Sequence, residues 1–224
     1  MASRRAYQDG CAAAHALDLI GERWALLVVR ELLLGPKRFT DLRASLPGIS
    51  PNVLTQRLTD LEEIGAVRRH HLPPPAASWV YDLTGWGREL EPVLQQLGRW
   101  GARSPALPRG EAISLATLVT AMKTMFHPPA AEGLNATLAL RIGRDDFAVR
   151  VGEGQFEIGR GVPSDPDAVI QTDVPTLGAL IFGGVPLADA EREGTATVHG
   201  DRALAGRFLR LFVLPEPVET RPGV

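Results

Sequence analysis

Two amide side chains, Asn52 and Gln56, lie four positions apart in a segment that has helical periodicity. Apolar residues recur every three or four positions between 51 and 64, which predicts a helix with one buried side. They are Leu54, Leu58, Leu61 and Ile64. The amides fall on the opposite side. An amide donates and accepts at once, so it can make a bidentate hydrogen bond with adenine in a DNA major groove.

Other side chains of this segment would lie near the same bases. Thr55 or Val53 could contact a thymine methyl group, and Thr59 lies on the same polar side as the amides. Arg57 lies nearer the buried edge by its helical angle. Two interpretations of Arg57 stay open, a DNA contact and a structural ion-pair partner.

The remaining candidate DNA contacts are groups that neutralise or hydrogen-bond phosphates. Backbone N–H groups at helix N-termini and basic side chains both do this. Thr40 is a predicted N-cap of a short helix, and Ser50 is a predicted N-cap of the next one, with Pro51 at its first position. The basic candidates are Lys37, Arg38, Arg68, Arg69, His70 and His71.

The elements that must position these groups follow from periodicity and from turn residues. We expect helices over 11–20, 22–34, 40–46 and 51–64, two strands over 66–72 and 78–83, and a helix over 85–100. This order is that of a winged helix-turn-helix, which places one helix in a major groove and a hairpin beside it. A helical module that binds another protein is the alternative.

Three strings in this half resemble the HxlR family of winged-helix regulators. They are GERWALLVVRELLLGPKRFTDL (21–42), LPGISPNVLTQRLTDLEEIGAV (46–67) and YDLTGWGREL (81–90). The resemblance covers about residues 8–101 and implies a dimeric transcription regulator whose recognition helix is 51–64. Asn52 stands where a lysine is expected in the family, so the operator sequence cannot be carried over.

A homodimer is also expected on physical grounds. One winged helix contacts few phosphates, and affinity for DNA grows with the number of counterions released. A two-fold dimer doubles the contacts and spaces two recognition helices about one turn of DNA apart. The predicted interface is the apolar side of the helices at 11–20 and 85–100, namely Ala12, Leu19, Leu90, Val93, Leu94, Leu97 and Trp100.

The single cysteine, Cys11, lies four positions from His15 on the same predicted helix. Proteins that resemble this family often carry a redox-sensing cysteine near the N-terminus. A neighbouring imidazolium would lower the pKa of the thiol and favour the reactive thiolate. The alternative is a small buried hydrophobic residue. A lone cysteine forms no intrachain disulfide, which suits a cytoplasmic location.

Charge is distributed unevenly between the two halves of the chain. The net charge is −2, which alone argues against a nucleic-acid partner. Residues 1–110 hold 14 Lys and Arg against 11 Asp and Glu, a balance of +3, whereas 111–224 have a balance of −5. The asymmetry predicts two units with different partners. No apolar run reaches the roughly 18 residues of a membrane span, so no membrane partner is expected.

The second half alternates helices with short strands, which predicts an α+β fold. We expect a helix over 112–126, an antiparallel meander over 136–159, and further strands and helices to 212. The strings DAVIQTDVPTLGALIFGG (167–184) and GTATVHGDRALAGRFLRLF (194–212) resemble sterol-carrier-protein-like domains, which implies an antiparallel sheet with helices and a cavity for a hydrophobic ligand.

The predicted cavity is lined by flexible or aromatic apolar side chains, which suit an adaptable pocket. They are Met122, Met125, Phe126, Phe147, Phe156, Leu180, Ile181, Phe208 and Phe212. The alternative is that these side chains form the core of the unit.

No residue pattern predicts catalysis, a cofactor or a metal site. His127, His199, Asp173 and Ser164 have no spacing that sets up a nucleophile and base, and no Cys/His cluster for zinc is present. We predict a winged-helix domain at 1–101, a linker at 102–111, a sterol-carrier-like domain at 112–213 and a tail at 214–224.

The predicted function is a non-enzymatic, homodimeric regulator that binds double-stranded DNA and responds to an apolar small molecule. A redox-sensing regulator acting through Cys11 is one alternative. A hydrophobic-ligand carrier or accessory protein without DNA binding is the other.

Overall fold

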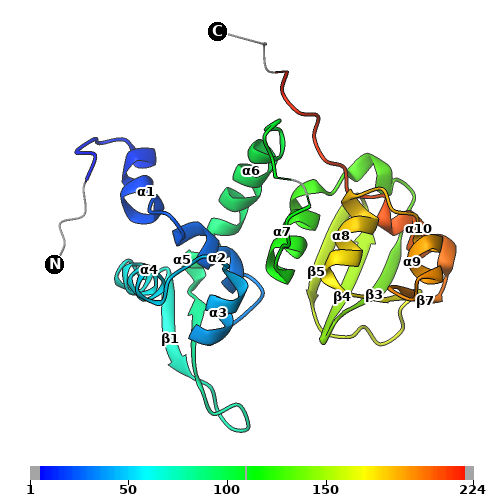
Figure 1. Ribbon diagram of the computed structural model, residues 1–224, viewed down its shortest axis with the longest axis horizontal. Helices are drawn as coiled ribbons and strands as arrows, with labels where there is room; N and C mark the ends of the chain where they lie inside the picture. Colours follow the sequence, from blue (N-terminus) through cyan, green and yellow to red (C-terminus); the bar gives the residue numbers. More distant parts are fainter. Residues whose placement is uncertain (1–5, 109, 220–224) are drawn as a thin grey trace. The chain divides into compact units, whose positions relative to one another are not determined.

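A computed structural model describes residues 6–108 and 110–219 of the chain (Figure 1). The chain divides into two compact units, Met1–Leu94 and Gln95–Val224. Each unit has its own buried side chains, as expected for two modest cores. None of the helices in the described part is long and apolar enough to cross a membrane.

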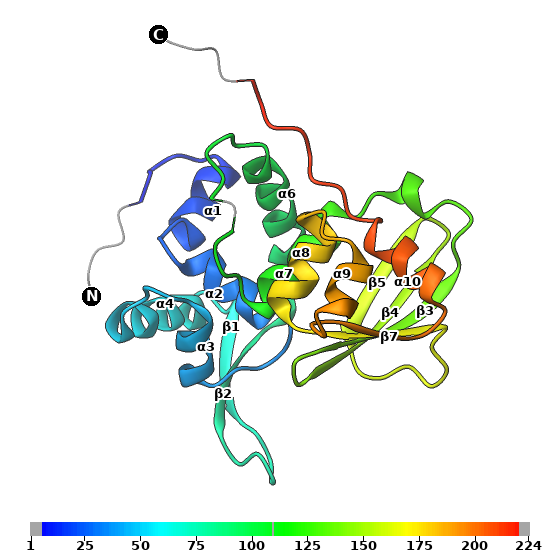
Figure 2. The ribbon, with the colours of Figure 1, turned by 45° about the vertical axis from the view of Figure 1, so that its right-hand side comes forward.

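The first unit consists of helices and one hairpin. The helices are α1 (Ala12–Ile20), α2 (Ala25–Leu32), α3 (Phe39–Ser45), α4 (Pro51–Glu63), α5 (Gly85–Arg88) and α6 (Leu90–Ala102), which continues into the second unit. Strands β1 (Val67–His71) and β2 (Trp79–Leu83) pair antiparallel between α4 and α5. Their hairpin projects away from the helices (Figures 1 and 2). The predicted winged helix-turn-helix order is confirmed.

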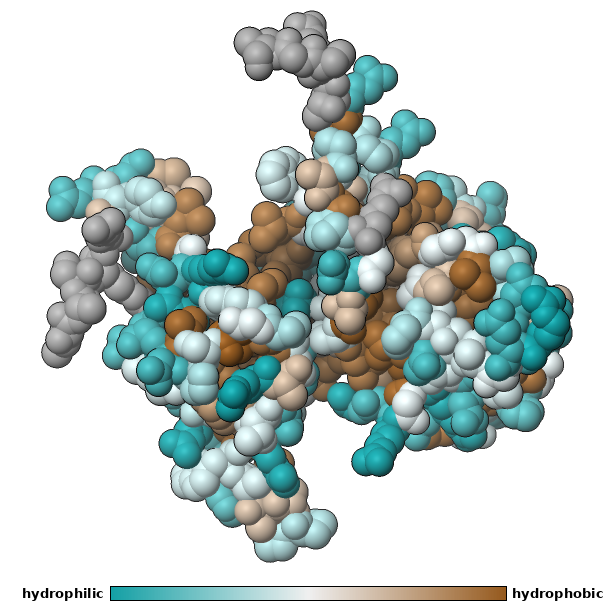
Figure 3. Space-filling view, viewed as in Figure 1, coloured by the Kyte–Doolittle hydropathy of each residue, from teal (hydrophilic) through white to brown (hydrophobic). Residues whose placement is uncertain are grey.

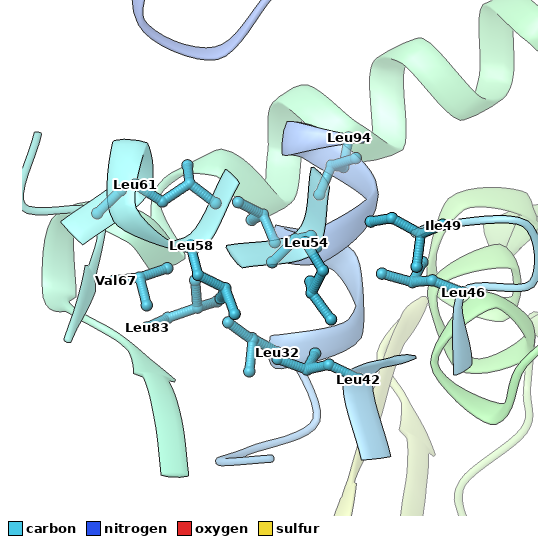
Figure 4. Close-up of a cluster of buried hydrophobic side chains, with 13 residues drawn as sticks. Leu32, Leu42, Leu46, Ile49, Leu54, Leu58, Leu61, Val67, Leu83 and Leu94 are labelled. Atoms are coloured by element: carbon cyan, nitrogen blue, oxygen red, sulfur yellow. The ribbon is translucent and has the colours of Figure 1, made fainter. Parts of the chain in front are cut away.

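The core of the first unit is a cluster of leucines and other aliphatic side chains from α2, α3, α4, α6 and the hairpin (Figure 4). Three of them, Leu54, Leu58 and Leu61, lie along one side of α4 and are at most 1% exposed. Burial of one such side chain contributes about 1.5–3 kcal/mol. This row therefore fixes which side of α4 faces inward and leaves the opposite side to solvent.

Several boundaries in the first unit differ from the prediction. The second helix begins at Ala25 instead of residue 22, because Trp24 has a left-handed backbone with φ of +80° that ends any helix before it. The helix expected at 85–100 is divided at Glu89 into α5 and α6. The division between the units falls inside α6, after Leu94, and the Arg99 side chain donates a hydrogen bond to the Thr124 carbonyl oxygen within the second unit.

The second unit is one five-stranded sheet with helices. Its elements are α7 (Leu115–Met125), the 3₁₀ helix η1 (Pro128–Ala131), β3 (Ala136–Ile142), β4 (Asp145–Gly152), β5 (Gln155–Arg160), β6 (Ala168–Thr172), α8 (Val174–Phe182), α9 (Leu187–Arg192), β7 (Thr197–Gly200) and α10 (Arg202–Leu209). The strand order is β5-β4-β3-β6-β7. Ser114 and Asp201 cap α7 and α10 through their side chains.

The sheet is mixed, which corrects the expected all-antiparallel arrangement. The meander β3-β4-β5 is antiparallel as predicted, but β6 pairs parallel with β3. After β5 the chain returns across the sheet before it enters β6 on the other side of β3, and such a return produces a parallel pair. Alternate residues of β3 and β4 are buried, and helices α7 to α10 lie toward that face (Figure 2).

Candidate nucleic-acid interface

Helix α4 begins at a side-chain cap. The Ser50 hydroxyl oxygen accepts a hydrogen bond from the Val53 N–H at 3.3 Å, and Pro51 occupies the first helical position, as predicted. Pro51 has no N–H to leave unsatisfied, and its fixed φ suits a helix start. The start of α4 is therefore determined by its own sequence.

The side of α4 opposite the leucines is exposed along its whole length. It carries Asn52, Val53, Thr55, Gln56 and Thr59, all exposed. The Thr55 hydroxyl donates to the Pro51 carbonyl oxygen at 2.9 Å, which leaves the methyl group as the outward part of that side chain. The structure thus brings together the five side chains that the sequence assigns to base contacts.

Arg57 lies at the edge of this surface in two ion pairs. Its Nη1 is 3.2 Å from Glu22 Oε2, and its Nη2 is 3.1 Å from Asp60 Oδ2. The Arg57 side chain is only 14% exposed. These contacts favour the structural alternative for Arg57. The periodicity of α4 alone could not identify Glu22, which belongs to the α1–α2 loop.

Lys37 is likewise engaged inside the first unit. Its ammonium donates to Glu31 Oε2 at 2.8 Å and to Ser45 Oγ at 3.2 Å. Glu31 is fully buried and also pairs with Arg30 at 3.0 Å. A buried carboxylate needs such partners because desolvation disfavours its charge. Lys37 therefore has a structural role that competes with the predicted phosphate contact. The sequence did not predict its pairing with Glu31.

The residues before and within α3 differ from the prediction at one position. Arg38, with an extended backbone, is the N-cap, so α3 begins at Phe39 and Thr40 is not the cap. The Arg38 guanidinium donates to Ser78 Oγ at 3.0 Å and to the Ala76 carbonyl oxygen, which ties it to the hairpin loop. Arg43 on α3 is exposed and has no ion pair among the described residues. It was not among the predicted DNA contacts.

One face of the hairpin holds a buried carboxylate between two arginines. Asp82, 5% exposed, accepts from Arg68 Nη2 at 3.1 Å and from Arg88 Nη2 at 2.9 Å. The strand register places Arg68 opposite Asp82. The charge of Arg68 is thus only partly compensated, because Asp82 is shared with Arg88. His70 lies on the same strand, half-buried, and its Nδ1 has no hydrogen-bond partner in the described part.

The other face of the hairpin presents an arginine on aromatic rings. The Arg69 guanidinium lies 4.9 Å from the ring centre of Trp79 and 5.8 Å from that of Tyr81. His71 packs edge-on against Trp79 at 5.4 Å. Within the described chain no carboxylate pairs with Arg69, so its positive charge stays available to an anion. Sequence reasoning found Arg69 and His71 but missed the two aromatic residues.

Cys11 is exposed immediately before α1. The backbone N–H groups of Ala14 and then Ala13 lower the pKa of its thiol below the ordinary value. His15, which we expected to have this effect, is not among the causes. The thiol is therefore accessible and favours the thiolate, for a reason that lies in the helix N-terminus.

Helix α1 contains no buried residue, although most of its side chains are apolar. Ala12 is exposed, Leu17 is 52% exposed and Leu19 is half-buried. On α6 the exposed fractions are 48% for Val93, 49% for Leu97 and 76% for Trp100. Figure 3 shows brown apolar surface over both helices. Leu94 and Leu90, by contrast, belong to or pack against the core of the first unit.

The side chains assigned to a cavity in the second unit pack against one another. Phe126 stacks on Phe156 at 5.4 Å, and Phe156 meets Phe212 edge-on at 5.2 Å. Phe208 also contacts Phe212. The other members are buried: Met122, Met125, Phe147, Leu180 and Ile181. The contacts favour the alternative that these residues form the core.

A pocket of about 720 Å³ lies elsewhere in the second unit. It is lined by Pro128, Pro129, Ala131, Glu132, Gly133, Leu134, Asn135, Glu153 and Gly154. None of the predicted cavity residues is among them. In the described part of the chain no group of three or more His, Cys, Asp or Glu side chains is arranged to hold a metal ion.

Comparison with known proteins assigns the first unit to a family. A model described as HxlR-like helix-turn-helix matches residues 19–106. The uncharacterized HTH-type transcriptional regulator YvaP of Bacillus subtilis is 39% identical over 85 residues, which are 38% of this chain and 79% of that protein. YodB, an HTH-type transcriptional regulator of B. subtilis, is 38% identical over 38% of this chain and 76% of its own length.

A solved structure of the reduced form of YodB is 33% identical, with a TM-score of 0.39, and covers 44% of this chain and 97% of that chain. The two curated relatives match this chain over most of their own length. The chain belongs to the HxlR-like helix-turn-helix family of transcriptional regulators.

Proposed function

We propose that this protein binds double-stranded DNA operators as a homodimer, with α4 in the major groove and the β1–β2 hairpin against the backbone. The observation that carries the proposal is the two-sided structure of α4. Leucines at most 1% exposed lie on one side, and five exposed side chains suited to base contacts lie on the other. A major groove admits one helix presenting such a side.

The charged groups around α4 support the same placement. Arg43 and Arg69 are exposed and have no carboxylate partner among the described residues, and Arg38 connects α3 to the hairpin loop. Positive groups on both sides of a recognition helix would contact the two phosphate strands that border a groove. We include Arg68, His70 and His71 as weaker contacts of the hairpin.

Homodimerisation is supported by the exposed apolar surface of α1 and α6. Large side chains such as Leu17, Leu97 and Trp100 lie in solvent in the single chain. Exposed apolar side chains of this size favour an interaction site on each helix. A two-fold pair through these helices would present two copies of α4 to successive major grooves, about 34–36 Å apart.

We propose further that the second unit receives an apolar small molecule that shifts DNA affinity. The pocket of about 720 Å³ beside η1 supports this assignment. A ligand changes DNA affinity only if it binds the two DNA-affinity states unequally. A compound shown to stabilise the second unit on heating, yet without effect on DNA affinity in a gel-shift titration, would contradict the proposal.

A thiol-based signal is the second candidate, because Cys11 is exposed and its pKa is lowered by the N-terminal N–H groups of α1. An adduct or an intersubunit disulfide at this helix would alter the proposed dimer. The test compares the wild type with Cys11→Ser in DNA binding before and after diamide treatment. A normal response of the variant would exclude Cys11 as the sensor.

The test of DNA binding is selection of duplexes from a randomised pool by the full chain, followed by titration of the selected duplex at several salt concentrations. We expect a symmetric sequence and a linear fall of log affinity with log salt. Asn52→Ala with Gln56→Ala should remove the sequence preference. Gln171→Ala, an exposed amide on β6, is the matched control. An affinity that is independent of both DNA sequence and salt concentration would contradict the proposal.

A further inference from the structure

The amide of Gln56 is not free to turn in this structure. Its Nε2 donates to Asp60 Oδ1 at 2.8 Å, one helical turn further along α4. A carboxylate only accepts hydrogen bonds, so this contact determines which end of the amide faces Asp60. The Oε1 atom and the second Nε2 hydrogen remain for an outside partner.

Asp60 is itself held in place. Its second oxygen, Oδ2, lies 3.1 Å from Arg57 Nη2, and Arg57 Nη1 lies 3.2 Å from Glu22 Oε2. The side chains of Asp60 and Arg57 are 17% and 14% exposed, so water competes little for the contact between these two. A chain of contacts therefore runs from the α1–α2 loop through Arg57 and Asp60 to Gln56.

This arrangement limits what Gln56 can recognise. One acceptor and one donor side by side complement the N6 amino group and the N7 atom of adenine. Without Asp60, rotation of the amide would exchange donor and acceptor, and other bases would then be accepted. We propose that Asp60, held by Arg57, is a positioning residue that fixes the amide orientation of Gln56 and thereby the preference of α4 for an adenine. This inference rests on the proposed DNA binding by α4.

The test is duplex selection and affinity measurement with four proteins: wild type, Gln56→Ala, Asp60→Asn and Glu63→Gln. Gln56→Ala identifies the base position that Gln56 reads in each half-site. A bidentate contact discriminates by about 5- to 150-fold. We expect Asp60→Asn to reduce discrimination at that position to about threefold or less. Other positions and the salt dependence should stay as in the wild type.

Glu63→Gln removes a carboxylate of the same helix that is exposed and is not linked to Gln56, so it should leave every preference unchanged. An Asp60→Asn protein that keeps the full preference at the Gln56 position would overturn the inference. So would an equal loss at all positions, since that would indicate only a structural role. Failure of the proposed function itself is distinguishable, because the wild type would then select no sequence.

Asp60→Asn could fail to fold, which a thermal melt would show. Glu22→Gln then provides the second variant, because Glu22 is 70% exposed and lies outside α4. Glu22→Gln should reduce base discrimination at the Gln56 position only, and by a smaller factor than Asp60→Asn. If Asp60→Asn does not fold, the inference depends on Glu22→Gln. A folded Glu22→Gln protein with wild-type base preference at the Gln56 position would then overturn the inference.

Discussion

Arg69→Ala should weaken DNA binding by removing one phosphate contact from each hairpin. The Arg69 guanidinium lies over Trp79 and Tyr81 and has no carboxylate partner in the described chain. Its neighbour Arg68 pairs with the buried Asp82 on the opposite face of the hairpin. Adjacent arginines of one strand therefore differ in how much of their charge an outside anion can use.

The magnitude follows from counterion release. Each phosphate neutralised contributes about 0.9 to the slope of log affinity against log salt. Loss of Arg69 should reduce that slope by about 0.9 per protomer, or about 1.8 in a dimer. Loss of a cation–π contact at an exposed site costs the fold only about 0.5–1 kcal/mol. Arg68→Ala should reduce the slope by less than Arg69→Ala does, because Asp82 partly compensates Arg68. It should destabilise the fold by less than about 1 kcal/mol, because Arg88 still pairs with Asp82 and Arg68 is 63% exposed.

The assay is fluorescence anisotropy of a labelled selected duplex, titrated with each protein between about 50 and 200 mM salt. Urea unfolding of the same preparations measures stability. An unchanged slope for Arg69→Ala would refute the reasoning. A larger loss of slope for Arg68→Ala would show that the ion pair with Asp82 opens on DNA and that the two arginines have the reverse roles.

Four further outcomes test the remaining assignments. Lys37→Ala should reduce the free energy of unfolding by about 2 kcal/mol in urea titrations, because it removes one of the partners of buried Glu31, and should leave the salt slope unchanged. Gly87→Ala should lower the free energy of unfolding by more than about 2 kcal/mol, because a Cβ there would lie 2.0 Å from the Ala66 carbonyl oxygen. A melting temperature equal to that of the wild type would contradict this. Leu97→Glu should convert the proposed dimer into monomers in sedimentation, and an unchanged mass would exclude α6 from the interface. The alkylation rate of Cys11 should rise through a midpoint at lower pH than that of an unperturbed cysteine, because its pKa is lowered; an ordinary midpoint would contradict this.

Features determined by nearby residues were predictable from the sequence. Ser50, Pro51 and the leucine spacing specify α4 within one stretch of chain, and the structure confirms its start and its buried side. The order of helices and hairpin in the first unit was predictable for the same reason. The meander β3-β4-β5 was also predictable, since short turns between alternating strands produce antiparallel neighbours.

Features that depend on how separate elements pack against one another were not predictable. The engagement of Lys37 depends on Glu31, a carboxylate in a helix position that periodicity alone would leave to solvent. The parallel pairing of β6 with β3 depends on the path of the chain across the sheet. Phenylalanine and methionine occur both in packed cores and in the walls of apolar cavities. Only the contacts among the aromatic side chains of the second unit distinguish the two.

The ion pairs of the first unit determine how much of its small positive charge can act on DNA. Glu31, Asp60 and Asp82 each pair with a basic side chain that the sequence offers as a candidate DNA contact. Among the described residues, Arg43 and Arg69 stay unpaired near α4. A single protomer with so few free cations would release few counterions, and its affinity would be low at cellular salt. Operator binding should then depend steeply on pairing of two protomers, so a signal that alters α1 or α6 would control DNA binding without contacting α4.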